Sequence, residues 1–115
     1  SVIMHKMAER FYYMYYAAKA RNWRLARHFY GGMLHALHTA DVTRPKWSEP
    51  LAEFEEEYLK PVLEVIRAQN WEEFEENFRR ATEGHHRYHQ RFGYGHIRFK
   101  LPDVPPPFFD MEAEG

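Results

Sequence analysis

Apolar side chains recur every three or four residues along most of this chain, which is the spacing of helices that bury one face. The recurrence falls into four blocks, and it predicts helices over approximately residues 2–20, 23–40, 49–68 and 71–92. A chain of 115 residues is long enough for one domain around one hydrophobic core. We therefore expect a single all-α domain over residues 1–93.

Two short junctions separate these helices, and their sequences are similar. One reads Ala-Arg-Asn-Trp at residues 20–23, and the other reads Ala-Gln-Asn-Trp 48 residues later. Asn22 and Asn70 are good helix N-caps, and Glu73 completes a capping-box pattern after Asn70. Because short connections make neighbouring helices antiparallel, the junctions predict two helical hairpins in an up-down-up-down four-helix bundle.

The third and fourth helices carry further local signals. Ser48 is a candidate N-cap, and Pro50 is tolerated in the first turn of a helix. Pro61 lies inside the third helix and should kink it, because proline lacks an N–H donor and its ring crowds the preceding turn. At the end of the fourth helix, Gly93 predicts a stop.

Residues 94–115 are predicted to form an extended tail, because prolines at positions 102, 105, 106 and 107 exclude a helix. The segment is also too apolar to stay in solvent. Its large apolar residues are Ile97, Phe99, Leu101, Phe108 and Phe109. We expect the tail to lie across the bundle or across a partner, with residues 111–115 frayed.

Composition and charge exclude several classes of function. Residues 1–47 hold eight Lys/Arg against two Asp/Glu, whereas residues 48–83 hold four against eleven. This separation favours charged outer faces on the helices, with attraction between the two halves or docking on a protein partner as alternatives, and the net charge of −1 gives no reason to expect nucleic acid binding. No apolar run is long enough to span a membrane.

The usual catalytic motifs are also missing from the sequence. The chain has no cysteine, so it has no disulfide, no thiolate metal site and no cysteine nucleophile. It has only two serines, and Gly31-Gly32 lies inside a helical pattern without the features of a phosphate-binding loop. We therefore expect no enzyme activity.

Aromatic residues crowd the first helix, where Tyr12, Tyr13, Tyr15 and Tyr16 stand beside the core stripe. A helix that is aromatic nearly all round is usually buried on more than one side. The glycine pair in the second helix would permit close backbone approach. We therefore expect a homodimer through the first helical hairpin, or contact with a larger protein assembly.

Histidines on two helices suggest a metal site. His85 and His89 are one turn apart and share a helix face, and His35 and His38 form a similar pair. Counted from the start of each helix, the two pairs lie at matching heights on parallel helices. They predict a shared site for a transition metal such as Zn, Cu or Ni. The alternative is that these histidines cap packed faces through ring hydrogen bonds.

A second cofactor hypothesis comes from the bundle topology. In an up-down-up-down bundle the start of the first helix lies beside the end of the fourth, which brings Met4 and Met7 close to His85 and His89. A thioether facing an imidazole is a possible axial pair for haem iron. The alternative for both methionines is that they fill the core.

The chain resembles the cytochrome c′, c556 and b562 group of four-helix haem proteins. More closely, it resembles small periplasmic c-type relatives with an Asn-Trp-x-Leu-Ala turn and a terminal Cys-x-x-Cys-His motif. The resemblance spans roughly residues 3–105, and its matching residues are Met4, Asn22-Trp23-Arg24-Leu25-Ala26, Phe29-Tyr30 and Gly84 to His89. His85 and Tyr88 stand where the two cysteines would be, so covalent haem attachment is excluded.

The resemblance implies that haem b could still be held without a covalent link. His89 stands where the ligating histidine would be, Met4 or Met7 would lie opposite it, and His85 would be an alternative ligand. It also implies a periplasmic protein for electron transfer, with a redox partner, or for small-gas binding. Two further hypotheses stand beside this one: a cofactor-free structural or accessory subunit, and a metal-binding module that uses the four histidines.

Overall fold

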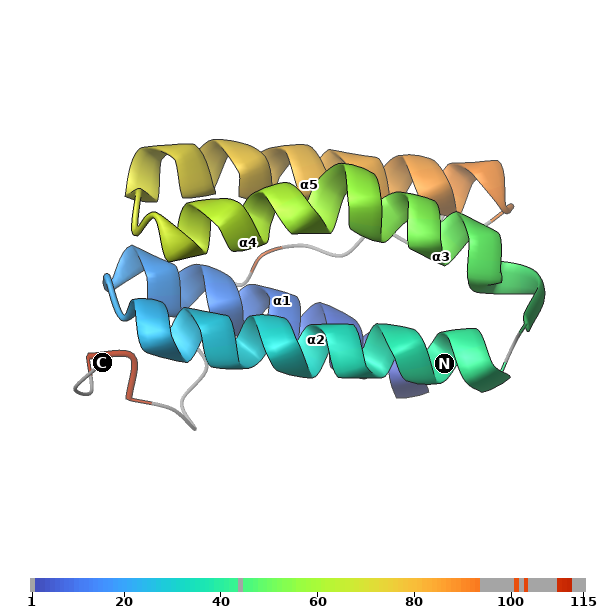
Figure 1. Ribbon diagram of the computed structural model, residues 1–115, viewed down its shortest axis with the longest axis horizontal. Helices are drawn as coiled ribbons and strands as arrows, with labels where there is room; N and C mark the ends of the chain where they lie inside the picture. Colours follow the sequence, from blue (N-terminus) through green and yellow to red (C-terminus); the bar gives the residue numbers. More distant parts are fainter. Residues whose placement is uncertain (1, 44, 94–100, 102, 104–109, 113–115) are drawn as a thin grey trace.

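The computed structural model describes residues 2–43, 45–93, 101, 103 and 110–112, with the backbone alone at residues 2–5, 40–43 and 45. Its helices are α1 (Val2–Lys19), α2 (Trp23–Thr43), α3 (Ser48–Phe54), α4 (Lys60–Arg67) and α5 (Trp71–Arg91). A 3₁₀ turn, η1 (Pro45–Trp47), precedes α3, and a π-helical turn, η2 (Glu55–Leu59), joins α3 and α4 into one rod. The helical rods lie side by side in alternating directions (Figure 1), which confirms the predicted all-α bundle.

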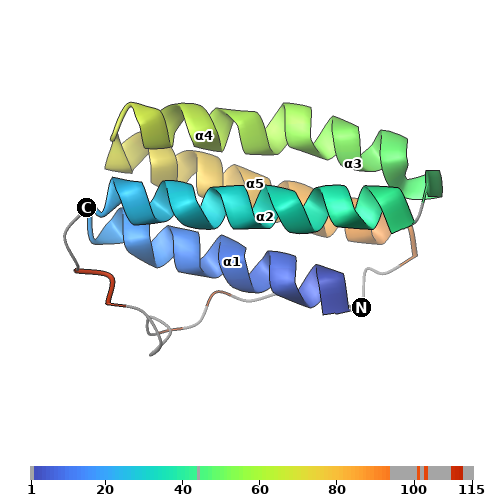
Figure 2. The same ribbon diagram turned by 60° about the horizontal axis from the view of Figure 1, so that its bottom comes forward.

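The rods follow the order of the chain around the bundle. α1 packs against α2 and α5, α2 packs against the α3–α4 rod, and α4 packs against α5. Figure 2 shows the same arrangement from a second direction. α2 and α5 therefore lie on a diagonal, with the bundle axis between them. None of the described helices is long and apolar enough to cross a membrane.

The two Asn-Trp junctions share one backbone conformation. Arg21 and Gln69 occupy equivalent positions and have positive φ values of 63° and 53°. At the first junction, the amides of Arg21 and Asn22 donate to the carbonyls of Ala18 and Ala17, each at 2.9 Å. The second junction has the same pair of hydrogen bonds. Both are Schellman endings, in which a left-handed residue closes the last helical turn.

The predicted helix signals at these junctions are confirmed. Asn22 Oδ1 accepts a hydrogen bond from the Leu25 amide, and Asn70 Oδ1 accepts one from the Glu73 amide, each at 3.1 Å. Each asparagine thus satisfies an amide that the first turn of its helix leaves without a partner. Gly93 has a φ of 86° just after α5, as expected of a helix stop.

The third rod begins differently from the prediction. Ser48 is the first residue of α3 and not its N-cap. The preceding residue, Trp47, has helical φ and ψ values and makes no side-chain cap hydrogen bond. The reason is that η1 runs directly into α3, so a turn of helix already precedes Ser48.

A π-helical turn, η2, lies directly before Pro61, where the sequence predicts a kink. Pro61 has no N–H to offer the Glu57 carbonyl four residues earlier, and Arg80 Nη1 of α5 donates to this carbonyl at 2.9 Å. On the other side, the Tyr30 hydroxyl of α2 donates to the Leu59 carbonyl at 3.1 Å. The irregular turn is therefore fixed to both neighbouring helices.

The predicted apolar stripes form the core. The largest fully buried side chains are Phe74, Met14, Met33, Leu37, Leu59 and Val62. Within α1, Tyr12 and Tyr16 are buried, and the Tyr15 ring lies 4.8 Å from the Phe78 ring of α5. The chain itself thus covers much of the aromatic surface that led us to expect a homodimer, and dimerisation stays a prediction.

Most of the predicted tail, including its prolines, lies outside the described residues. At its described end, the Met111 side chain is 7% exposed and belongs to the core. The Met111 carbonyl accepts a hydrogen bond from Asn22 Nδ2 at 3.3 Å. The expectation of fraying at residue 111 was therefore wrong, because an apolar side chain is stabilised by burial beside the first junction. Leu101 also packs against the core.

Candidate functional site

A small cavity lies inside the bundle, and all of its helical rods contribute side chains to it. Met7 comes from α1, Met33 from α2, Phe54 from α3 and His85 from α5. The cavity volume is about 30 Å³, which gives room for roughly two water-sized particles. None of the described residues around it carries a carboxylate. Its soft metal-binding groups are two thioethers and one imidazole, and the Tyr12 and Thr82 side chains add two hydroxyl groups to the lining.

Burial keeps the His85 imidazole neutral. The pKa of His85 is lowered from 6.5 to about 4, mainly because burial disfavours the charged ring, and positive charge on His89 and His86 would lower it further. The Phe54 ring lies edge-on to His85 at 5.9 Å, and the His89 ring lies 4.2 Å away, measured between ring centres. Neutral imidazole is the form that coordinates metals.

The structure brings together two of the four residues predicted as haem ligands. Met7 and His85 line the same cavity, as expected if the start of α1 lies beside the end of α5. His89 is partly exposed and packs on the His85 ring instead of lining the cavity. The side chain of Met4 lies outside the described residues.

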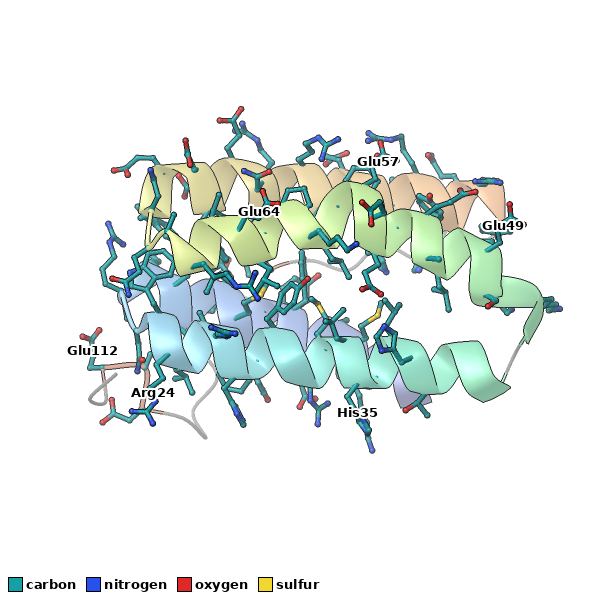
Figure 3. All side chains as sticks on the ribbon, in the orientation of Figure 1. Arg24, His35, Glu49, Glu57, Glu64 and Glu112 are labelled. Atoms are coloured by element: carbon teal, nitrogen blue, oxygen red, sulfur yellow. The ribbon has the colours of Figure 1, made fainter. Side chains whose placement is uncertain are left out.

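The two histidine pairs predicted to share a metal ion do not come together. His35 is exposed and points away from the bundle (Figure 3). His38 Nε2 lies 2.9 Å from Glu55 Oε1 of the neighbouring rod. Because α2 and α5 are diagonal, equal height does not bring side chains on their outer faces into contact. Across the described part of the chain, no three His, Cys, Asp or Glu side chains form a metal-binding group.

Met33 is a cavity residue that was not among the predicted ligands. Its side chain is 2% exposed and lies on the buried stripe of α2. Counted from the first junction, Met7 and Met33 stand at similar heights on antiparallel neighbours. Two methionines at one height are the sequence signal for this pair, whereas the histidine spacing predicted a site on the outer face of α2.

The Tyr58 ring packs between the α3–α4 rod and α5, next to the residue that precedes His85. This ring lies so near Gly84 that a Cβ atom at this position would come within 2.5 Å of it. Arg87 Nη2 donates to the Tyr58 hydroxyl at 2.8 Å, and the Arg80 guanidinium lies 4.8 Å from the ring centre. Gly84, the residue before the histidine cluster, is thus needed for the packing of Tyr58.

The described side chains leave little space for a haem group beside the histidine cluster. Pockets for cofactors and drug-sized ligands measure roughly 300–1,000 Å³, whereas this cavity measures about 30 Å³. Tyr58 packs directly on Gly84, and the Phe54 and Tyr88 rings are 5.4 Å apart, so the described residues form no slot for a flat macrocycle beside the histidine cluster. The haem hypothesis stays a prediction that this packing does not support.

No protein-family model, curated protein or solved structure matches this chain. The resemblance to four-helix cytochromes therefore stays a prediction, as does the periplasmic location that it implies.

Proposed function

We propose that this protein binds a transition-metal ion inside its four-helix bundle, with His85 and Met7 as ligands. The observation that carries the proposal is that these side chains, from the start and the end of the bundle sequence, line the same cavity. Imidazole is a common ligand of Zn, Cu and Ni, and thioether sulfur favours copper. Unlike haem, a single ion needs no more space than the cavity offers.

The surroundings of His85 favour coordination. Since burial lowers the pKa of His85 to about 4, a metal ion would not compete with a proton for the ring at neutral pH. Contacts with the rings of Phe54 and His89 restrict rotation of the imidazole. A ligand that is already ordered loses less conformational entropy when the ion binds.

Metal analysis of protein purified from its native source tests this proposal. We expect roughly one transition-metal ion per chain, and an absorption spectrum without a Soret band. A Soret band would contradict the proposal and favour the haem hypothesis. Protein that carries no metal and binds none on titration would favour the accessory-subunit hypothesis instead.

Calorimetric titration of the metal-free protein with copper, zinc and nickel salts tests the ligands. Substituting a residue that only supports a metal ligand typically weakens metal binding by roughly 10–100-fold. Because His85 is itself a proposed ligand, His85→Leu should weaken binding by at least this much. His35→Leu, which changes an exposed histidine, should leave the affinity unchanged. If His89→Leu abolishes binding while Met7→Leu has no effect, the ligands are the His85–His89 pair and the proposed set is wrong.

A further inference from the structure

A second thioether makes the cavity rich in sulfur. Met7, Met33 and His85 reach it from α1, α2 and α5, and the two methionines are 6% and 2% exposed. Met14 is also fully buried but does not line the cavity. The lining of the cavity therefore includes two particular methionines and not every buried methionine of the core.

This donor set carries no charge and is chemically soft. Thioether sulfur selects Cu(I) among biological metals, whereas Zn(II) and Ni(II) are commonly bound by imidazole together with anionic or water ligands. A divalent ion in the cavity would have no carboxylate to balance its charge among the described lining residues. A monovalent ion has a smaller desolvation penalty, so the charge balance also favours Cu(I).

The size and the lining of the cavity also favour Cu(I). With a volume of about 30 Å³, it admits an ion that has shed its water shell, not a hydrated divalent ion. The aromatic side chains of Phe11, Tyr12 and Phe54 complete much of the wall. Aromatic faces attract cations without adding a negative charge, so they stabilise a monovalent cation in this cavity.

We infer that the cavity is a site for Cu(I), held by the sulfur atoms of Met7 and Met33 and the imidazole of His85. The inference rests on the proposed function and names its metal. The ligands come from α1, α2 and α5, so the bound ion would also link both helical hairpins. Ag(I), which shares the charge and softness of Cu(I), should occupy the same site.

An anaerobic competition titration tests the inference on the full chain. Bicinchoninate, a coloured Cu(I) ligand, reports how much Cu(I) the protein withdraws, and parallel titrations measure Zn(II) and Ni(II). We expect tight Cu(I) binding, with Zn(II) and Ni(II) at least about tenfold weaker. X-ray absorption at the copper edge of the wild-type complex should show both sulfur and nitrogen neighbours.

Three variants locate the site. Met7→Leu and Met33→Leu keep the volume of the side chain and remove the sulfur; each should weaken Cu(I) binding by at least about tenfold. Met14→Leu, a buried methionine away from the cavity, should leave the affinity unchanged. Circular dichroism establishes that each variant is folded.

Two outcomes would overturn the inference, and they are distinguishable. If Zn(II) or Ni(II) binds through His85 and outcompetes Cu(I), or if copper shows no sulfur neighbours, the Cu(I) assignment fails while the proposed function stands. If the wild-type chain binds none of these metals, both the assignment and the proposed function fail.

Discussion

Gly84 shows how closely a single residue can be constrained by packing. Adding a Cβ would place it 2.5 Å from the Tyr58 ring, and this ring is held by Arg87 and by the Arg80 guanidinium. We predict that Gly84→Ala lowers the free energy of unfolding by about 1–3 kcal/mol, the usual cost of overpacking a core. Chemical denaturation followed by circular dichroism measures the effect.

Gly31 provides the matched control. It also lies within a helix, but it is exposed and an added Cβ would meet no atom within 4 Å. Gly31→Ala should therefore stabilise the protein by up to about 1 kcal/mol, the difference in helix propensity. Equal effects of the two substitutions would show that helix propensity, and not contact with Tyr58, determines the result.

The partly buried His85 predicts a pH dependence in the metal-free protein. Its pKa is about 4 in the folded chain and 6.5 when exposed, so between these values the unfolded chain binds a proton that the folded chain does not. The free energy of unfolding should therefore fall as the pH falls through this window, by at most about 1.4 kcal/mol per pH unit. Urea denaturation across the window measures the slope.

The His85→Leu variant isolates this contribution, since the other titratable groups remain. Its stability should depend less on pH between 6.5 and about 4 than that of the wild type. Parallel curves for the two proteins would mean that His85 is not held neutral by burial.

At the scale of elements, the two junctions place a left-handed residue at the equivalent position, but the side chains of these two residues make different contacts. Gln69 is exposed and adopts a φ of 53°, a conformation that costs a residue with a Cβ roughly 1–2 kcal/mol. Glycine avoids this cost and adds some unfolded-state entropy. We predict that Gln69→Gly stabilises the protein by about 0.5–1 kcal/mol in thermal or chemical denaturation.

Arg21→Gly is the informative comparison. The Arg21 guanidinium lies 4.8 Å from the centre of the Trp71 ring, and it donates to the Lys19 carbonyl at 2.7 Å. Glycine would remove both contacts, so its gain should be smaller than at Gln69. A less stable Gln69→Gly protein would show that the positive φ is not strained at this junction.

At the scale of the whole molecule, Asn22 joins the first junction to the end of the chain. Asn22→Ala and Asn70→Ala should each cost about 1 kcal/mol through the lost N-cap. Asn22→Ala should cost about 1–2 kcal/mol more, because it also leaves the Met111 carbonyl without the Asn22 donor. Denaturation measures the difference.

Hydrogen exchange at the end of the chain distinguishes the two roles of Asn22. Exchange near Met111 should increase in the Asn22→Ala protein and stay unchanged in the Asn70→Ala protein. Equal stability losses and equal exchange in the two variants would mean that the Met111 contact does not contribute to stability.

The sequence by itself determined the helices and most of their ends, the start of the third rod excepted. Apolar spacing placed the helices within a few residues, and Asn22, Asn70 and Gly93 marked boundaries that the structure confirms. These features depend on residues no more than about four positions apart, which are close in space whatever the rest of the chain does. Short junctions then required antiparallel neighbours, so the bundle topology also followed.

Only the tertiary structure decided which side chains meet inside the bundle. The diagonal placement of α2 and α5 separates His35 from the histidine cluster, while Met33 joins Met7 and His85 at one cavity. The fit of Tyr58 on Gly84 is likewise a contact between different rods. Such contacts depend on how far each helix is rotated about its own axis, and packing among all the rods sets that rotation.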